Sequence, residues 1–208
     1  MQNQFFKSEA IGFGWNVAKS NLGFFVLLFL LYYAVFLALG IVGGIIGKDV
    51  VLLSAIVSLA SWIIGIVMSM GFIKIYLKLV DGQKPVYHDL FLNYHLFLNY
   101  LLGSIVYGLL IAIGLILFII PGVYFALKFQ FASYFIIDKG VDPITAFKMS
   151  SKMTQGMKIN LLLFDILLFL VIIAGFLALG VGLVLAVPTT SVALAFVYRK
   201  LSSQVTSS

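Results

Sequence analysis

Two ionisable residues lie well inside apolar stretches of this sequence. Lys128 interrupts the stretch 96–137, and Asp165 interrupts the stretch 159–198. Placing a charged side chain at the centre of a membrane-spanning helix costs about 2.5–3.5 kcal/mol, so a residue of this kind usually has a partner or a function. Lys128 and Asp165 are therefore the candidates for coupling a proton or a substrate to transport. The alternatives are a structural ion pair, or a lysine whose stem carries its ammonium to the lipid headgroups.

The rise of an α-helix allows Lys128 and Asp165 to meet. Lys128 precedes Asp138 by ten residues, and Asp165 follows Lys158 by seven. Along straight helices these separations are about 15 Å and about 10 Å, counted from the same side of the membrane. The structural interpretation of the pair is favoured, because a single pair without further polar lining makes a poor pathway.

The sequence offers little to a metal ion, a cofactor or a hydrolytic reaction. It contains no cysteine, which excludes thiolate metal sites and disulfides. His88 and His95 lie two helical turns apart, about 10 Å, whereas zinc-binding helices place their ligands about one turn apart. Nucleophile elbows, phosphate-binding loops and paired catalytic carboxylates are not recognisable. We therefore expect a protein that is not an enzyme and that holds no cofactor or metal.

The composition indicates which elements position these residues. Hydrophobic residues make up 63% of the 208 residues and charged residues only 10%, with a mean hydropathy of +1.18. A soluble domain carries about 25% charged residues. Apolar stretches cover residues 22–47, 50–73, 96–137 and 159–198. Because one membrane-spanning helix needs about 20 residues, the last two stretches must each fold back. We expect an all-α integral membrane protein, a single domain over 1–208, with six transmembrane helices arranged as three hairpins.

Glycine and proline mark where the two longest stretches turn. The segment Gly180-Val181-Gly182 is the expected tip of the last hairpin. In the stretch 96–137 the turn falls either at Gly114 or at Pro121-Gly122. A turn just before Pro121 is favoured, because proline is tolerated in the first turn of a helix.

The basic residues predict the orientation of the chain. Cytoplasmic connections carry an excess of lysine and arginine, and here eleven of these residues share one side, against Lys48 alone on the other. Both termini are therefore expected in the cytoplasm. The net charge of +6 does not indicate nucleic-acid binding, because no basic patch with interleaved aromatics is present. The expected partners are the bilayer and its anionic headgroups on the cytoplasmic side. The eleven residues are Lys7, Lys19, Lys74, Lys78, Lys84, Lys139, Lys148, Lys152, Lys158, Arg199 and Lys200.

A stretch with helical periodicity precedes each expected hairpin, after Ser8, after Pro85 and after Asp142-Pro143. Such amphipathic helices typically lie in the membrane interface. The chain then divides into three repeat-like units, about 1–82, 83–140 and 141–201. In support, the letters FLALG at 36–40 recur at 176–180, and Pro121 with a following ALxF recurs as Pro188. Units of this kind would be related by an axis along the membrane normal. The apolar face expected for the first amphipathic helix consists of Phe6, Ala10, Phe13 and Val17.

Small residues predict where helices approach closely. Gly40 with Gly44, and Gly43 with Gly47, fit the small-x-x-x-small pattern of packed membrane helices. Packing within the chain is the first expectation, and a homodimer or another membrane protein on this face is the alternative. Pro121, Gly122 and Pro188 are likewise assigned to helix packing rather than to chemistry.

The segment 118–165 resembles a known family. Its run Ile120-Pro121-Gly122 leads to Lys128, then to Asp138 near a helix end and to an amphipathic helix containing Ala146. This pattern is similar to a broad family of uncharacterised bacterial membrane proteins that includes the membrane domain fused to some glycerophosphodiester phosphodiesterases. The resemblance implies a six-helix protein of the bacterial inner membrane. The catalytic phosphodiesterase domain is absent, so the resemblance implies no enzymatic activity.

Two classes of function follow from these observations. The dry spans, rich in Leu, Ile and Phe, favour a non-enzymatic component of the membrane, acting in assembly, as a partner or in envelope homeostasis. The alternative is a small transporter or permeation protein, which the repeat-like units and the Lys128/Asp165 pair would support.

Overall fold

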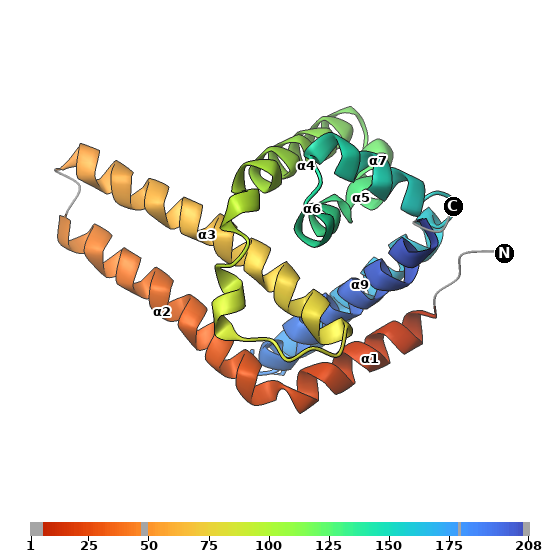
Figure 1. The fold of residues 1–208 in the computed structure, drawn as a ribbon, viewed down its shortest axis with the longest axis horizontal. Helices are drawn as coiled ribbons and strands as arrows, with labels where there is room; N and C mark the ends of the chain where they lie inside the picture. The colour runs from red at the N-terminus through yellow and green to blue at the C-terminus, as the bar shows by residue number, and fades with distance from the viewer. Residues whose placement is uncertain (1–5, 47–49, 179, 206–208) are drawn as a thin grey trace.

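The computed structural model describes residues 6–46, 50–178 and 180–205, and these ranges fold into helices joined by turns (Figure 1). The predictions of an all-helical chain and of six helical stretches long and apolar enough to span a membrane are both confirmed; the stretches cover residues 22–45, 51–80, 87–117, 119–139, 158–177 and 183–203. The α-helices are α1 (Lys7–Ser20), α2 (Leu22–Ile46), α3 (Val51–Val80), α4 (Phe97–Leu117), α5 (Ile119–Phe129), α6 (Ala132–Lys139), α7 (Pro143–Met153), α8 (Lys158–Leu177) and α9 (Leu183–Val205).

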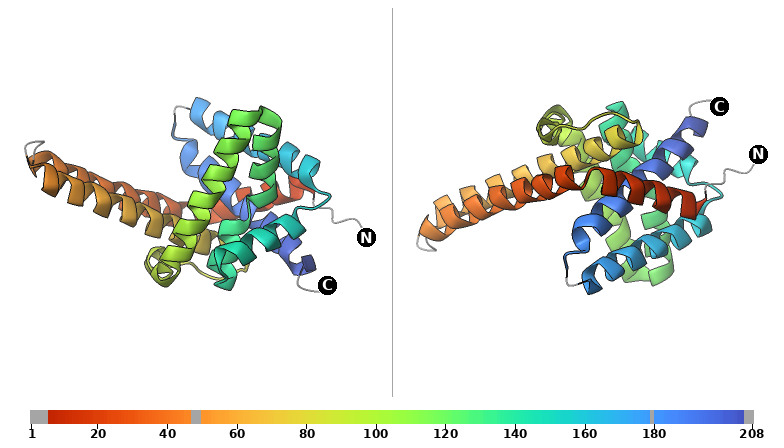
Figure 2. Two further views of the ribbon diagram at one scale, coloured as in Figure 1. Left: turned by 90° about the horizontal axis from the view of Figure 1, so that it is seen from above. Right: turned by 90° about the horizontal axis from the view of Figure 1, so that it is seen from below.

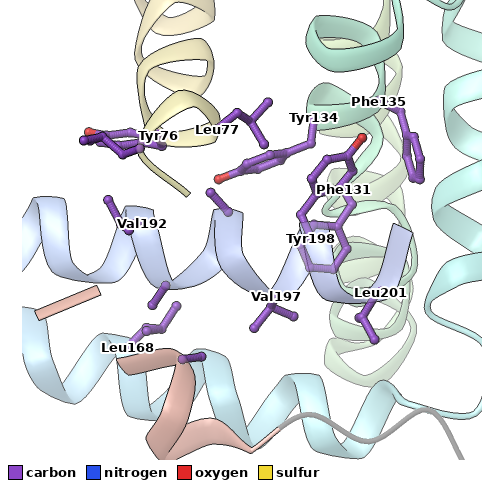
Figure 3. Packing of buried hydrophobic residues seen from close by; sticks show 14 of the residues in the cluster. Tyr76, Leu77, Phe131, Tyr134, Phe135, Leu168, Val192, Val197, Tyr198 and Leu201 are labelled. Atoms are coloured by element: carbon purple, nitrogen blue, oxygen red, sulfur yellow. The ribbon is translucent and has the colours of Figure 1, made fainter. Parts of the chain in front are cut away.

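Helix α9 is the centre of the fold. Its Tyr198 is fully buried, and its ring lies 5.3 Å from that of Tyr134 and 5.1 Å from that of Phe135, both on α6 (Figure 3). Leu77, in the last turn of α3, belongs to the same core. Large aromatic side chains thus hold α3, α6 and α9 together at one end of the molecule.

Helix α1 packs along α9 rather than standing apart (Figure 1). Its buried residues are Ala10, Gly14 and Ala18, spaced four apart on one face. A side chain on Gly14 would collide with the carbonyl oxygen of Thr189, so glycine permits the close approach of the two backbones. The expected apolar face was therefore only partly right, because the closest contact belongs to the small residues.

The stretch after Pro85 forms two short 3-10 helices, Tyr87–Leu90 and Tyr94–Leu96, instead of the expected amphipathic helix. The reason is Asp89, whose side chain is fully buried and accepts hydrogen bonds from Lys78 Nζ at 2.6 Å and from the Val86 backbone at 2.8 Å. Gly71 lets the backbone of Leu90 lie directly on α3. These contacts turn the segment inward and interrupt a regular helix.

Glycines lie at the two turns where the chain reverses direction, between α4 and α5 and between α8 and α9. Phe118 has extended backbone angles between α4 and α5, which leaves Pro121 in the first turn of α5, as favoured from the sequence. Gly114 and Gly122 then approach so closely that a Cβ on Gly114 would lie 2.7 Å from the Cα of Gly122. The turn between α8 and α9 uses Gly180 at φ 76°, a conformation that glycine adopts without strain. Pro188 lies inside α9.

Helices α2 and α3 form an arm that projects from the rest of the molecule (Figures 1 and 2). We define the α2–α3 arm as residues 30–45 and 51–67. None of its side chains is buried among the described residues. The expected packing within the chain is not met at Gly40 and Gly44, because no atom of another described element lies within 4 Å of an added Cβ there. Gly43 meets only Val57 of α3, at 3.7 Å, and Gly47 lies outside the described residues.

Candidate functional site

Lys128 and Asp165 do not form an ion pair in the described part of the chain. The distances expected from the sequence assumed one straight helix up to Asp138, but α5 ends at Phe129 and α6 begins at Ala132. The bend places the ring of Phe131 in the core, where it is fully buried.

The ammonium groups of Lys128 and Lys158 lie over the same aromatic ring. The Lys128 ammonium is 5.8 Å from the ring centroid of Tyr124, and the Lys158 ammonium is 4.9 Å from the same centroid. Lys158 is the first residue of α8. The two ammonium groups thus share an aromatic neighbour, whereas Asp165 lies seven residues beyond Lys158 on α8, about 10 Å along the helix.

Asp165 is partly buried and lies near Tyr107 of α4. The Tyr107 hydroxyl donates its hydrogen bond to the carbonyl oxygen of Ala126, at 3.1 Å, rather than to a carboxylate. Lys128 and Asp165 thus have different neighbours, and the geometry offers no direct transfer of charge between them.

Lys128 lines a pocket of about 530 Å³ between α5 and α7, which we call the lysine pocket. Lysines from both helices line it, together with polar and aromatic side chains. Among the described residues, none of the side chains that line it is acidic. Its lining consists of Lys128, Phe129, Ile144, Phe147, Lys148, Ser151, Lys152 and Gln155.

Hydroxyl groups on α7 hold the lysine pocket together. The bend after α5 leaves the Lys128 carbonyl without its helical partner, and it accepts hydrogen bonds from Ser150 Oγ at 3.0 Å and Thr154 Oγ1 at 3.2 Å. Both hydroxyl residues are fully buried. They fix α7 against the end of α5 and so bring its lysines beside Lys128.

The start of α7 follows the expected capping chemistry. Asp142 accepts a hydrogen bond from the Thr145 backbone at 3.1 Å, and Pro143 occupies the first turn. Hydrogen bonds from Thr145 hold the pKa of the Asp142 carboxyl below its usual value. The cap sets where α7 begins, and thereby which of its residues face α5.

A second cavity, of about 640 Å³, lies between α2, α3, α4 and the beginning of α9, and we call it the aromatic cleft. Its polar atoms are mainly tyrosine hydroxyls, and Ser69 Oγ lies 3.3 Å from the hydroxyl of Tyr100. The sequence contained a signal for it, because aromatic residues recur at helical spacing on both α2 and α3. They include Phe29, Tyr32, Tyr33, Phe72 and Tyr76.

A network of charges at one end of the molecule is structural. Arg199 donates two hydrogen bonds to Asp81, at 2.8 and 2.7 Å, and lies 2.7 Å from Asp138. The Tyr198 hydroxyl donates to the same Asp138 at 2.9 Å. One guanidinium thus joins the ends of α3, α6 and α9. Sequence reasoning missed it, because its members lie far apart along the chain.

No protein-family model, curated protein or solved structure matches this chain.

Proposed function

We propose that this protein is a non-enzymatic component of the bacterial cytoplasmic membrane, with both termini in the cytoplasm, and that its α2–α3 arm packs against a second copy of the chain. The resemblance of residues 118–165 to bacterial membrane proteins and the placement of the basic residues support the location and the orientation.

The projecting arm is the observation that carries this proposal. Its helices are apolar enough to span a membrane, yet only 11% of the best window of α2 and 6% of that of α3 is buried within the chain. Gly40 and Gly44 lie one turn apart on α2, and no atom of another described element lies within 4 Å of a Cβ built on either of them. Small residues at this spacing let helix backbones approach closely, and that packing drives association inside a membrane. A second copy would supply an identical arm and a two-fold interface.

Cysteine cross-linking in native membranes tests the arm, because the natural chain contains no cysteine. Leu37→Cys places a thiol one turn before Gly40 at a side chain that is 66% exposed. We expect oxidation to join two copies of this variant. Leu109→Cys, on α4 and 56% exposed, is the matched control and should stay monomeric. Equal cross-linking of the two variants, or none at Leu37→Cys, would refute the proposed contact.

The aromatic cleft supports a second candidate, a small permeation protein for an apolar molecule that carries a hydroxyl or amine. Its phenolic hydroxyls provide a few polar contacts within a largely apolar lining, which is the usual composition of a small-molecule site. Ser69→Phe would fill the cleft. Uptake of an apolar dye by proteoliposomes that falls with this substitution, but is unchanged by Lys128→Met, would favour the permeation protein.

A further inference from the structure

We propose that the lysine pocket binds the phosphate group of an anionic phospholipid. The site is formed by Lys128 of α5 together with Lys148 and Lys152 of α7. It is separate from the α2–α3 arm, so this inference and the proposed dimer can each fail without the other.

The positive charges that line the pocket favour the binding of an anion. Lys128 and Lys148 have no carboxylate within ion-pair distance among the described residues. Lys158 adds a further positive charge beside Tyr124, at the edge of the same region. Ammonium groups gathered in this way repel one another, and a phosphate between them would replace repulsion with attraction.

The donors of the pocket suit a phosphate. The ammonium groups of Lys128 and Lys148 each offer three N–H donors, and Ser151 and Gln155 add a hydroxyl and an amide. Lys148, Ser151 and Lys152 recur at helical spacing on one face of α7, and Gln155 follows just past the end of the helix. The hydroxyls of Ser150 and Thr154 fix the backbone of α7 against the end of α5, which keeps the positions that carry these donors on one side of the molecule.

The surroundings of the pocket favour a lipid over a free phosphate. Phe129, Ile144 and Phe147 border it, and Ile144 is 68% exposed. Lys128 of the pocket and Lys158, the first residue of α8, have their ammonium groups over the same Tyr124 ring, and α8 is apolar enough to span a membrane. A headgroup at the membrane surface would place its phosphate among the lysines and its glycerol and acyl carbons against these apolar side chains.

Lipid retention measured by native mass spectrometry tests the inference. The full chain would be released from detergent micelles containing either phosphatidylglycerol or phosphatidylcholine. We expect the natural chain to retain phosphatidylglycerol selectively. The triple variant Lys128→Gln, Lys148→Gln and Lys152→Gln should bind it at least about 25-fold more weakly, because Lys128 and Lys148 near an anionic headgroup each contribute about a factor of five.

Two further variants separate the pocket from overall charge and from misfolding. Lys7→Gln, Lys19→Gln and Lys84→Gln together remove the same charge from other described helices and loops, and should leave retention unchanged. The triple Lys→Arg variant of the pocket keeps its charge and should retain the lipid.

The inference is overturned if both glutamine triples lose phosphatidylglycerol equally, or if neither loses it. It is also overturned if inorganic phosphate displaces the lipid from the natural chain at the same concentration as the lipid, because the glycerol and acyl carbons would then add nothing to binding.

Discussion

The acidic side chains of the described chain differ in how they are neutralised. Asp81, Asp89 and Asp138 each have a cation within 2.7 Å. Asp165 has no such partner in the described ranges, although the sequence predicted that it could form an ion pair with Lys128. Depth within an apolar stretch identified both residues, but the bend at residues 130–131 decided their neighbours.

The separation of Lys128 and Asp165 predicts that their substitutions act independently. Asp165→Leu, Lys128→Met and the double variant should have effects on the unfolding free energy that add to within about 0.5 kcal/mol, as for residues without shared partners. Thermal unfolding in detergent measures this. Rescue of Asp165→Leu by Lys128→Met would show that the two charges interact after all.

Among the acidic residues, we expect substitution of Asp89 to lower the free energy of unfolding most. Its fully buried carboxylate accepts two hydrogen bonds, from Lys78 and from the Val86 backbone. We expect Asp89→Ala to lower the unfolding free energy by about 2–3 kcal/mol. Glu9→Ala breaks the exposed pair with Lys200 and should cost less than about 1 kcal/mol. Equal losses in the two variants would contradict the structural role assigned to Asp89.

At the scale of elements, local chemistry was readable from the sequence and close packing was not. The proline after Phe118 and the Asp142-Pro143 cap each act within one turn, and both the reversal of the chain and the start of α7 followed from them. The glycine that matters on α1 is Gly14, and its importance comes from α9, a helix far along the chain. Spacing alone pointed instead to the glycines of α2.

Two glycines of α1 should respond in opposite ways to alanine. Gly12 has open space around it, so Gly12→Ala should stabilise the protein by about 0.5–1 kcal/mol through helix propensity. Gly14→Ala forces α1 away from α9 and should destabilise it by about 1–3 kcal/mol. Thermal unfolding of both variants in one detergent provides the comparison. A stabilising Gly14→Ala would mean that α1 does not lie along α9 in this way.

At the scale of the whole molecule, the sequence predicted six apolar helices but not their arrangement. Hydropathy reports the length of each helix, whereas the positions of α9 and the α2–α3 arm depend on contacts between distant residues. Arg199 illustrates this, because it joins Asp81 and Asp138 from separate helices. The basic residues therefore have two roles: some join helix ends, and others line the lysine pocket. The number of lysines and arginines on one side of the membrane does not distinguish these roles.

The orientation of the chain is the premise on which the proposed location of the lysine pocket depends, and single-cysteine labelling in intact cells tests it most directly. Lys84→Cys and Ser203→Cys should react with a membrane-impermeant maleimide only after the cells are permeabilised. Lys48→Cys, at a position outside the described residues, should react without permeabilisation. Labelling of positions 84 and 203 from outside, with protection of position 48, would contradict a cytoplasmic location of the termini and of the lysine-rich side.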